Sequence, residues 1–215
     1  MNWVKNEFGI EFKTDSFHMF YGNKNGSLDQ LKKLYPQFEF RFLKQVHGNS
    51  CVLSSSEEVE ADAHYTDEKN LALCIRTADC NPVLIGSDSR VCAIHAGWRG
   101  VKSRIVKSSI DKCFQNISAN SYLALGPHIQ KDSFQVDKAL GEEFANDFDS
   151  AFIFQKPEHP DKSYVDLKSI LLSEHQMQFQ NHWASEEDTL TNEIYYSHRR
   201  EPQNKGRNIS FVARL

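Results

Sequence analysis

The chain has 215 residues and a formal net charge of −4, with 25 lysines and arginines against 29 aspartates and glutamates. This balance provides no basic field for a nucleic-acid backbone, so we expect no DNA or RNA partner. No apolar run approaches the roughly 18 residues that a membrane-spanning helix needs, so we expect no membrane partner.

The length and composition favour one domain over residues 1–215, with enough apolar residues for a real core. The first residues contain no apolar segment of signal-peptide type. Five cysteines, an odd number, favour reduced thiols over a disulfide framework. We therefore expect a cytoplasmic protein, either a monomer or a small homo-oligomer.

Hydrophobic periodicity predicts helices interspersed with strands. The first predicted helix, residues 27–35, can be capped by Ser27 and is stopped by Pro36. Further helices are predicted over 101–117, 138–148 and 166–180, and strands over 38–42, 71–75, 82–85, 91–94, 122–125, 152–154, 194–196 and 209–212. Residues 54–58 are predicted to form a loop. The order favours an α/β or α+β fold, a mixed sheet covered by helices, over a parallel Rossmann array.

Two of the predicted strands, 82–85 and 91–94, flank the turn residues Gly-Ser-Asp-Ser and predict a β-hairpin. If the turn centres near Asp88, paired residues have numbers that sum to about 176. Asn81 then lies opposite His95, with Cys80 as its neighbour. Cross-strand neighbours of this kind lie roughly 4.5–8 Å apart at Cβ. The Cys80 thiol and the His95 imidazole could therefore reach one ion.

A second imidazole, His47, follows the strand predicted over 38–42. Two histidines and one cysteine equal the ligand count of a catalytic zinc site whose fourth position is open. Taken singly, Cys80 is more often a buried small hydrophobic residue, and His95 a strand histidine with a hydrogen-bond partner. No His-x-His pair occurs, which argues against the copper cluster of a multicopper oxidase.

The other candidates each have a structural alternative. Arg99, between Gly97 and Gly100, could bind phosphate or carboxylate, or be a surface arginine at a helix start. Asp62 and Asp79 could orient a ligand histidine, act as a general base, or cap turns. Residues 197–200 with Arg207 form a second basic cluster, either an anion site or a solvated loop. The four remaining cysteines are expected to be core residues: Cys51, Cys74, Cys92 and Cys113.

Several motifs together resemble the laccase-domain family, also called the polyphenol oxidase or YfiH-type family, which includes the bacterial peptidoglycan editing factor. They are Gln-Val-His-Gly at 45–48, Ala-Asp-Ala at 61–63, Thr-Ala-Asp-Cys-Asn-Pro at 77–82 and His-Ala-Gly-Trp-Arg-Gly at 95–100. The resemblance continues in order through Leu-Gly-Pro-His-Ile at 125–129, Val-Asp-Leu at 165–167 and Tyr-Ser-His-Arg-Arg at 196–200. It covers most of the chain.

The resemblance implies a layered α/β sandwich, a fold shared with certain cysteine hydrolases, and a zinc ion held by His47, Cys80 and His95 as the catalytic centre. It implies a purine nucleoside phosphorylase that takes adenosine, inosine and methylthioadenosine with phosphate, and that also deaminates adenosine. Older descriptions of the family are of copper-dependent polyphenol oxidases. The substrate-binding residues expected on this basis are Gln45, Asp62, Asp79, Arg99, Arg199 and Arg200.

The chain departs from the family pattern at residues 128–136, at Asp188 and at His198. The three expected metal ligands are intact, so these departures bear on substrate preference. Three alternative functions stay open. They are a metal-free cysteine hydrolase with Cys80 as nucleophile and His95 as base, acting on cell-wall precursors; a copper-dependent phenol oxidase; and a non-catalytic factor that binds a metabolite.

Overall fold

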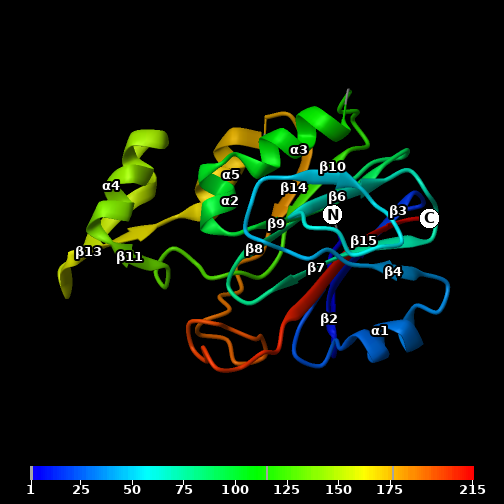
Figure 1. Ribbon diagram of the computed structural model, residues 1–215, viewed down its shortest axis with the longest axis horizontal. Helices are drawn as coiled ribbons and strands as arrows, with labels where there is room; N and C mark the ends of the chain where they lie inside the picture. Colours follow the sequence, from blue (N-terminus) through cyan, green and yellow to red (C-terminus); the bar gives the residue numbers. More distant parts are fainter. Residues whose placement is uncertain (1, 115, 176) are drawn as a thin grey trace.

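The protein forms two six-stranded β-sheets stacked face to face and covered by helices, as Figure 1 shows. The structure is a computed structural model and describes residues 2–114, 116–175 and 177–215. The first sheet has the order β1-β2-β3-β15-β7-β4, and the second β14-β10-β8-β9-β6-β5. A separate small sheet has the order β11-β13-β12. The expected mixed, helix-covered α/β fold is confirmed.

The first sheet comprises β1 (Val4–Asn6), β2 (Gly9–Lys13), β3 (Phe17–Gly22), β4 (Glu39–Arg41), β7 (Leu71–Thr77) and β15 (Asn208–Arg214). The second comprises β5 (Cys51–Leu53), β6 (Ala63–Thr66), β8 (Asn81–Gly86), β9 (Val91–Ala96), β10 (Tyr122–Leu125) and β14 (Asn181–Ala184). The small sheet comprises β11 (Gln135–Asp137), β12 (Ile153–Lys156) and β13 (His159–Val165). The helices are α1 (Leu28–Leu34), α2 (Trp98–Lys102), α3 (Ile105–Cys113), α4 (Lys138–Asp147) and α5 (Leu167–His175), with a 3-10 turn η1 (Ser150–Phe152).

Three apolar clusters fill the spaces between these layers. Residues such as Met19 and Leu73 from the first sheet pack on Leu84 and Ala93 from the second. On the outer face of the second sheet, α2, α3 and α5 bury the largest cluster. On the outer face of the first sheet, α1 covers a third cluster that includes Phe211. The protein therefore has four layers, helix, sheet, sheet and helices, because each sheet buries both faces.

Most predicted elements are present with small shifts of their ends. Ser27 caps α1 by accepting a hydrogen bond from the Gln30 amide at 3.3 Å, as predicted. The helix predicted over 101–117 is broken at Arg104, whose φ is +57°, and α3 ends at Cys113. The helix predicted over 166–180 ends at His175. Residues 115 and 176 of these two predictions lie outside the described residues.

Two predictions are wrong. Residues 194–196 form turns, because the Tyr195 amide donates to the Asn192 carbonyl and the Tyr196 amide donates to the Asn208 side chain. The hairpin register is shifted by one: Asn81 pairs with Ala96, and Pro82 pairs with His95. The cause is a four-residue loop closed by backbone and side-chain hydrogen bonds between Ser87 and Arg90, which moves the centre of the turn.

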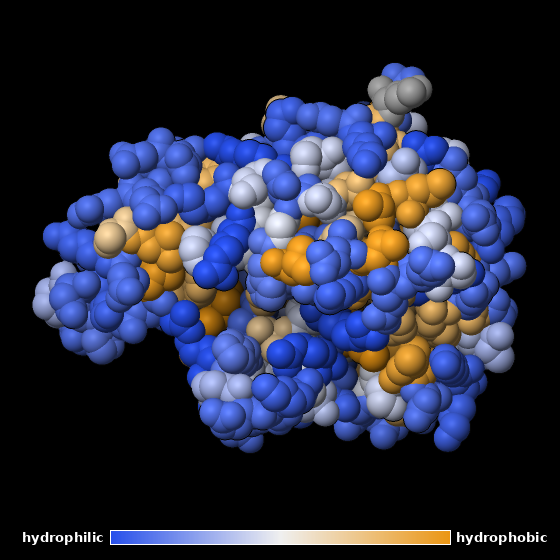
Figure 2. All heavy atoms as spheres, viewed as in Figure 1, coloured by the Kyte–Doolittle hydropathy of each residue, from blue (hydrophilic) through white to orange (hydrophobic). Residues whose placement is uncertain are grey.

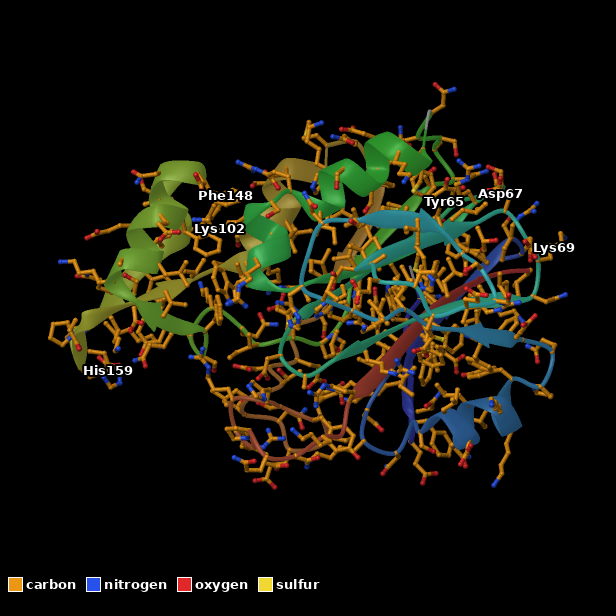
Figure 3. All side chains as sticks on the ribbon, viewed as in Figure 1. Tyr65, Asp67, Lys69, Lys102, Phe148 and His159 are labelled. Carbon is orange, nitrogen blue, oxygen red and sulfur yellow. The ribbon has the colours of Figure 1, made fainter. Side chains whose placement is uncertain are left out.

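The small sheet and α4 form a unit that projects from the two main sheets (Figure 1). Lys102 at the end of α2 pairs with Glu143 at 2.5 Å and with Asp147 at 3.2 Å, both on α4. Figure 3 labels Lys102 and Phe148 where this unit meets the helix layer, and Lys102 lies over the ring of Phe144 on α4. The projecting unit thereby forms one side of a recess that Figure 2 shows between it and the C-terminal loops.

Candidate metal centre and adjoining hollows

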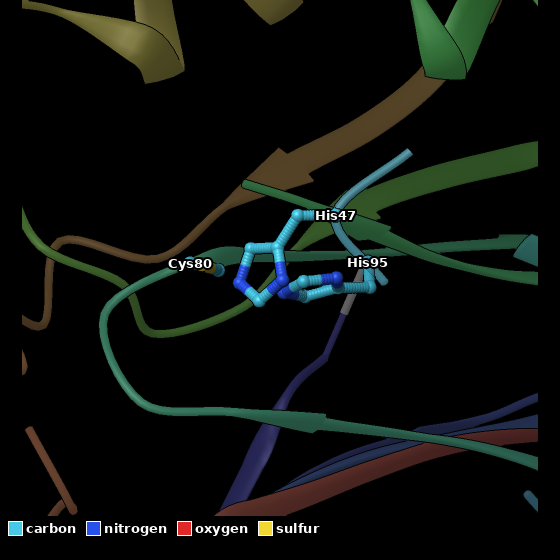
Figure 4. A group of neighbouring side chains, drawn as sticks. All are labelled: His47, Cys80 and His95. Atoms are coloured by element: carbon cyan, nitrogen blue, oxygen red, sulfur yellow. The ribbon is translucent and has the colours of Figure 1, made fainter. Parts of the chain in front are cut away.

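His47, Cys80 and His95 meet at one end of the β8–β9 hairpin. The ligand atom that each offers lies within 4.8 Å of the other two. Figure 4 shows the two imidazoles and the thiol converging from three separate segments. His47 is exposed, Cys80 is half-buried and His95 is buried. The centre therefore has a protein side and an open side.

The β8–β9 register accounts for two of the three positions. His95 lies opposite Pro82 in the ladder, and Cys80 is two residues before Pro82, so both point to the same side of the hairpin. Gly97 comes directly after the last residue of β9, and a Cβ built on it would lie 3.2 Å from both the Cys80 sulfur and the His47 ring. A glycine at this position leaves room for the three side chains to meet.

Asp62 positions both histidines of the centre, His47 and His95. Its carboxylate, fully buried, accepts hydrogen bonds from the backbone amides of Val46, His47 and Gly48 at 2.7–3.2 Å. These bonds hold His47 at a φ of +60°, a strained value for a residue other than glycine. The same carboxylate accepts from Nδ1 of His95 at 2.8 Å. In the neutral imidazole, Nε2 of His95 then carries the lone pair that can bind an ion.

The electrostatics of the three side chains depend on one another. Burial disfavours the charged forms, but the hydrogen bonds to Asp62 and Cys80 outweigh it and raise the pKa of His95 to about 9. Burial also opposes ionisation of Cys80, but the hydrogen bonds from His47 and His95 lower its pKa to about 7. The pKa of Asp62 is held below its usual value against burial, chiefly by His95. Near neutral pH the Cys80 thiol is therefore partly ionised, and the thiolate is the form that binds metals.

A hollow of about 500 Å³ opens beside the three side chains, in the recess seen in Figure 2. Its apolar wall consists of Trp98, Ile129, Phe134 and Leu167. The sequence placed Trp98, Ile129 and Leu167 within family motifs, but none of the four residues was predicted to belong to the site. Their signal was weak, because isolated apolar residues in loops and at helix starts have no periodicity to set them apart.

The polar side of this hollow carries Arg99, Arg199 and Asp79. Arg99 is exposed and lies over the Trp98 ring at 4.4 Å from its centre. Asp79 has a φ of +87° and is held by the Thr189 hydroxyl at 2.8 Å and the Arg199 amide at 2.7 Å. The predicted residues Asp79, Arg99 and Arg199 are thus brought to one cavity with His47 and Cys80.

A second hollow of about 530 Å³ shares His47 and Cys80 with the first and also includes His95. Its remaining lining includes three cations, Lys44, Arg76 and Arg207, and the Glu58 carboxylate, which pairs with Arg76 at 3.3 Å. Arg76 was not selected from the sequence, although an arginine inside the apolar strand β7 was a usable signal. His198 lines both hollows.

Three predicted substrate residues have structural partners instead of an open face. The Gln45 side chain lines the second hollow, but its amide is bonded in both directions to the backbone of Arg76, each at 2.8 Å. Asp62 is buried beneath the His47 loop, as described above. Arg200 donates to the carbonyls of Thr189, Leu190 and Tyr195, and in the described part of the chain it lines neither hollow.

In the described residues, no helix is both long and apolar enough to cross a membrane. The fold is similar to solved structures over nearly all of the chain. A Neisseria meningitidis protein of family DUF152 superimposes with a TM-score of 0.82 at 20% identity, covering 100% of this chain and 99% of that one. The hypothetical protein YfiH of Bacillus licheniformis superimposes with a TM-score of 0.78 at 21% identity, covering 92% of each chain.

Sequence comparison gives the same family. A protein named purine nucleoside phosphorylase from Clostridium acetobutylicum is 27% identical, covering 94% of each chain. The Escherichia coli purine nucleoside phosphorylase YfiH is 30% identical, covering 80% of this chain and 72% of that protein. The family model described as multi-copper polyphenol oxidoreductase laccase matches residues 23–215. The chain therefore belongs to this laccase-like polyphenol oxidoreductase family, of the YfiH or DUF152 type.

Proposed function

We propose that the protein is a zinc-dependent purine nucleoside phosphorylase that acts on inosine, adenosine and methylthioadenosine. The observation that carries this proposal is the juxtaposition of His47, Cys80 and His95 with a hollow that has an apolar wall and an arginine-bearing side. The names of its relatives support the same reaction class.

The three side chains fit zinc on their donor chemistry. Two imidazoles and one thiolate are preferred zinc ligands, and a catalytic zinc keeps its fourth position open. Asp62 supplies the carboxylate–histidine contact that orients such ligands. A zinc ion bound there would act as a Lewis acid on a substrate oxygen.

The hollow offers a separate surface to each part of a nucleoside. Trp98 and Phe134 present aromatic rings against which a flat purine can pack. Arg99 and Arg199 present guanidinium groups that suit phosphate. In the reaction a phosphate oxygen bonds to the anomeric carbon while the bond to the base breaks. The electron pair leaves on the purine, which takes up one proton. Binding both reactants in one hollow supplies proximity and orientation.

The test is an assay of the purified, zinc-loaded protein with inosine, with and without phosphate. We expect hypoxanthine and ribose 1-phosphate in equal amounts, and no base release without phosphate. Base release that ignores phosphate would indicate hydrolysis and contradict the proposal, as would a folded, zinc-loaded protein that releases no base.

Adenosine deamination is the second activity in the proposal, with water replacing the amino group at C6. Ammonia release from adenosine in the absence of phosphate measures it separately. The protein as purified, before zinc loading, distinguishes the alternatives. Covalent capture of Cys80 together with amide hydrolysis and no bound zinc would indicate a cysteine hydrolase, which the pKa of about 7 for this thiol would suit. Oxygen uptake with a phenol and stoichiometric copper would indicate a phenol oxidase.

A further inference from the structure

Three buried thiols meet on the helix-covered face of the second sheet. Cys51 begins β5, Cys92 lies in β9 and Cys113 ends α3. The Cys51 and Cys113 sulfurs are 3.4 Å apart, and all three sulfurs lie within 4.8 Å of one another. The three residues are 6%, 0% and 1% exposed. Each was expected singly to be core, but the fold brings them together into one cluster, called here the thiol cluster.

The thiol cluster is distinct from the centre formed by His47, Cys80 and His95. Cys92 and His95 are three residues apart on β9, which corresponds to about 10 Å of extended strand. An odd separation places their side chains on opposite faces of the sheet. The cluster packs with Val106 and Ile110 of the helix layer, whereas His95 bonds to Asp62 at the end of the hairpin.

We propose that Cys51, Cys92 and Cys113 bind one copper(I) ion through three thiolates. An ion about 2.3 Å from three sulfurs in a plane requires sulfurs about 4 Å apart, and the cluster spans 3.4 to 4.8 Å. Thiolate-only sites select soft ions such as copper(I). Structural zinc takes four ligands, and among the described residues this metal-ligating group has three.

The surroundings suit a charged sulfur site. The Ser109 hydroxyl is fully buried, has no hydrogen-bond partner among the described residues and lies one turn before Cys113 on the same face of α3. It can donate to a thiolate. Lys112 donates to the Cys51 carbonyl at 2.6 Å, and Arg90 donates to the Cys113 carbonyl while it also pairs with Asp67. Lys112 offsets part of the negative charge that three thiolates bring, whereas the charge of Arg90 is balanced by Asp67.

A surface hollow reaches one residue of the cluster, Cys113. The hollow has a volume of about 420 Å³ and is also lined by Arg90 and Asp67. Figure 3 labels Asp67 and Tyr65 at this end of the second sheet, and Tyr65 pairs with Cys92 in the ladder between β6 and β9. Loading exchanges the thiol protons for three copper–sulfur bonds. The protons pass to solvent, and copper stays in its +1 state.

The experiment uses the full chain carrying Cys80→Ala, which removes the only sulfur of the first centre. The reduced protein is loaded anaerobically with copper(I) in competition with a copper(I) chelator. We expect one retained equivalent, and an X-ray absorption spectrum with three sulfur neighbours and no nitrogen. Adding Cys113→Ser is expected to weaken binding at least 100-fold. Adding Cys74→Ser, a matched change at a buried thiol in β7, is expected to leave binding unchanged.

Three results would each overturn the proposal. They are a protein that retains no copper, a spectrum that contains nitrogen or oxygen neighbours, and two serine variants that lose binding equally. A Cys51–Cys113 disulfide formed under the loading conditions would also overturn it. If Cys113→Ser fails to fold, the X-ray absorption spectrum of the Cys80→Ala protein decides alone. Displacement of the copper by stoichiometric zinc would show that the cluster is not selective for a soft monovalent ion. The proposal does not depend on nucleoside phosphorolysis.

Discussion

Strand β9 contributes to two clusters of soft ligands that differ in almost every other respect. The first cluster, His47, Cys80 and His95, mixes nitrogen with sulfur and lies beside two hollows. The thiol cluster contains sulfur alone and lies under α3. The open, mixed cluster keeps a face for a reactant. The buried, uniform cluster offers no face to a reactant.

The two clusters also differ in how they are held. Asp62 binds three amides of the His47 loop and one ring nitrogen of His95, so a single carboxylate positions two ligands. The thiol cluster has no such organiser among the described residues. Its sulfurs are positioned by the β5–β6–β9 ladder and by the packing of α3. We therefore expect metal binding at the first cluster to be sensitive to substitution of Asp62. Metal binding at the thiol cluster should be sensitive to loss of one of its sulfurs.

The largest expected effect is at the sulfur of the open cluster. Loss of a residue that merely orients a metal ligand costs about 10–100-fold, so Cys80→Ala should reduce phosphorolysis by more than about 100-fold and abolish stoichiometric zinc. Cys74→Ala, at a buried thiol outside both clusters, should keep turnover. Initial rates of hypoxanthine release, with zinc analysis of the same samples, measure both. Full activity of a zinc-free Cys80→Ala protein would eliminate the open cluster as the reaction centre.

Much of the open cluster was predictable from sequence, because its ligands follow strands whose patterns are strong. The ends of β8 and β9 were nearly correct, and only the Ser87–Arg90 loop shifted the register by one. The thiol cluster was not predictable. Cys51, Cys92 and Cys113 each fit a buried apolar position, and nothing local says that three such positions coincide. Their meeting depends on long-range strand pairing and on where α3 docks.

The next effect tests the organiser. Asp62→Asn keeps the side-chain size but removes the negative charge of the carboxylate, which accepts hydrogen bonds from three backbone amides and from the His95 ring. We expect zinc affinity to fall by about 10–100-fold, while copper(I) affinity of the thiol cluster stays unchanged. The matched control is Asp67→Asn, the same substitution at an aspartate that pairs with Arg90 near the thiol cluster. It should leave zinc affinity intact. Competition with a chromophoric zinc chelator measures the change. Equal losses in both variants would mean that the two clusters are not independent.

A smaller effect separates binding of phosphate from binding of metal. Arg99 faces the first hollow, and a hydrogen bond to a charged group contributes about 1.5–3 kcal/mol. Arg99→Gln should raise the KM for phosphate by about 10-fold or more, with little change in the KM for inosine or in zinc content. Lys107→Gln, an exposed cation of α3 paired with Asp111, is the control. A phosphate KM that is unchanged in Arg99→Gln would move the phosphate subsite elsewhere, with the second hollow and its Arg207 as the next place to examine.

The smallest effect is also the sharpest comparison of empty and loaded thiol clusters. A buried hydroxyl without a partner costs about 1–3 kcal/mol, so Ser109→Ala should raise the free energy of unfolding of the metal-free protein by about 1 kcal/mol. Ser108→Ala, on the same helix with a half-buried hydroxyl bonded to the Ile105 carbonyl, should not. With copper(I) bound, the order is expected to reverse, because the Ser109 hydroxyl then has a thiolate to which it can donate. Urea unfolding under reducing, anaerobic conditions with and without copper(I) measures both states. If Ser109→Ala gains the same stability in both, the hydroxyl plays no part in holding an ion, and the thiol cluster would have to bind copper by its sulfurs unaided.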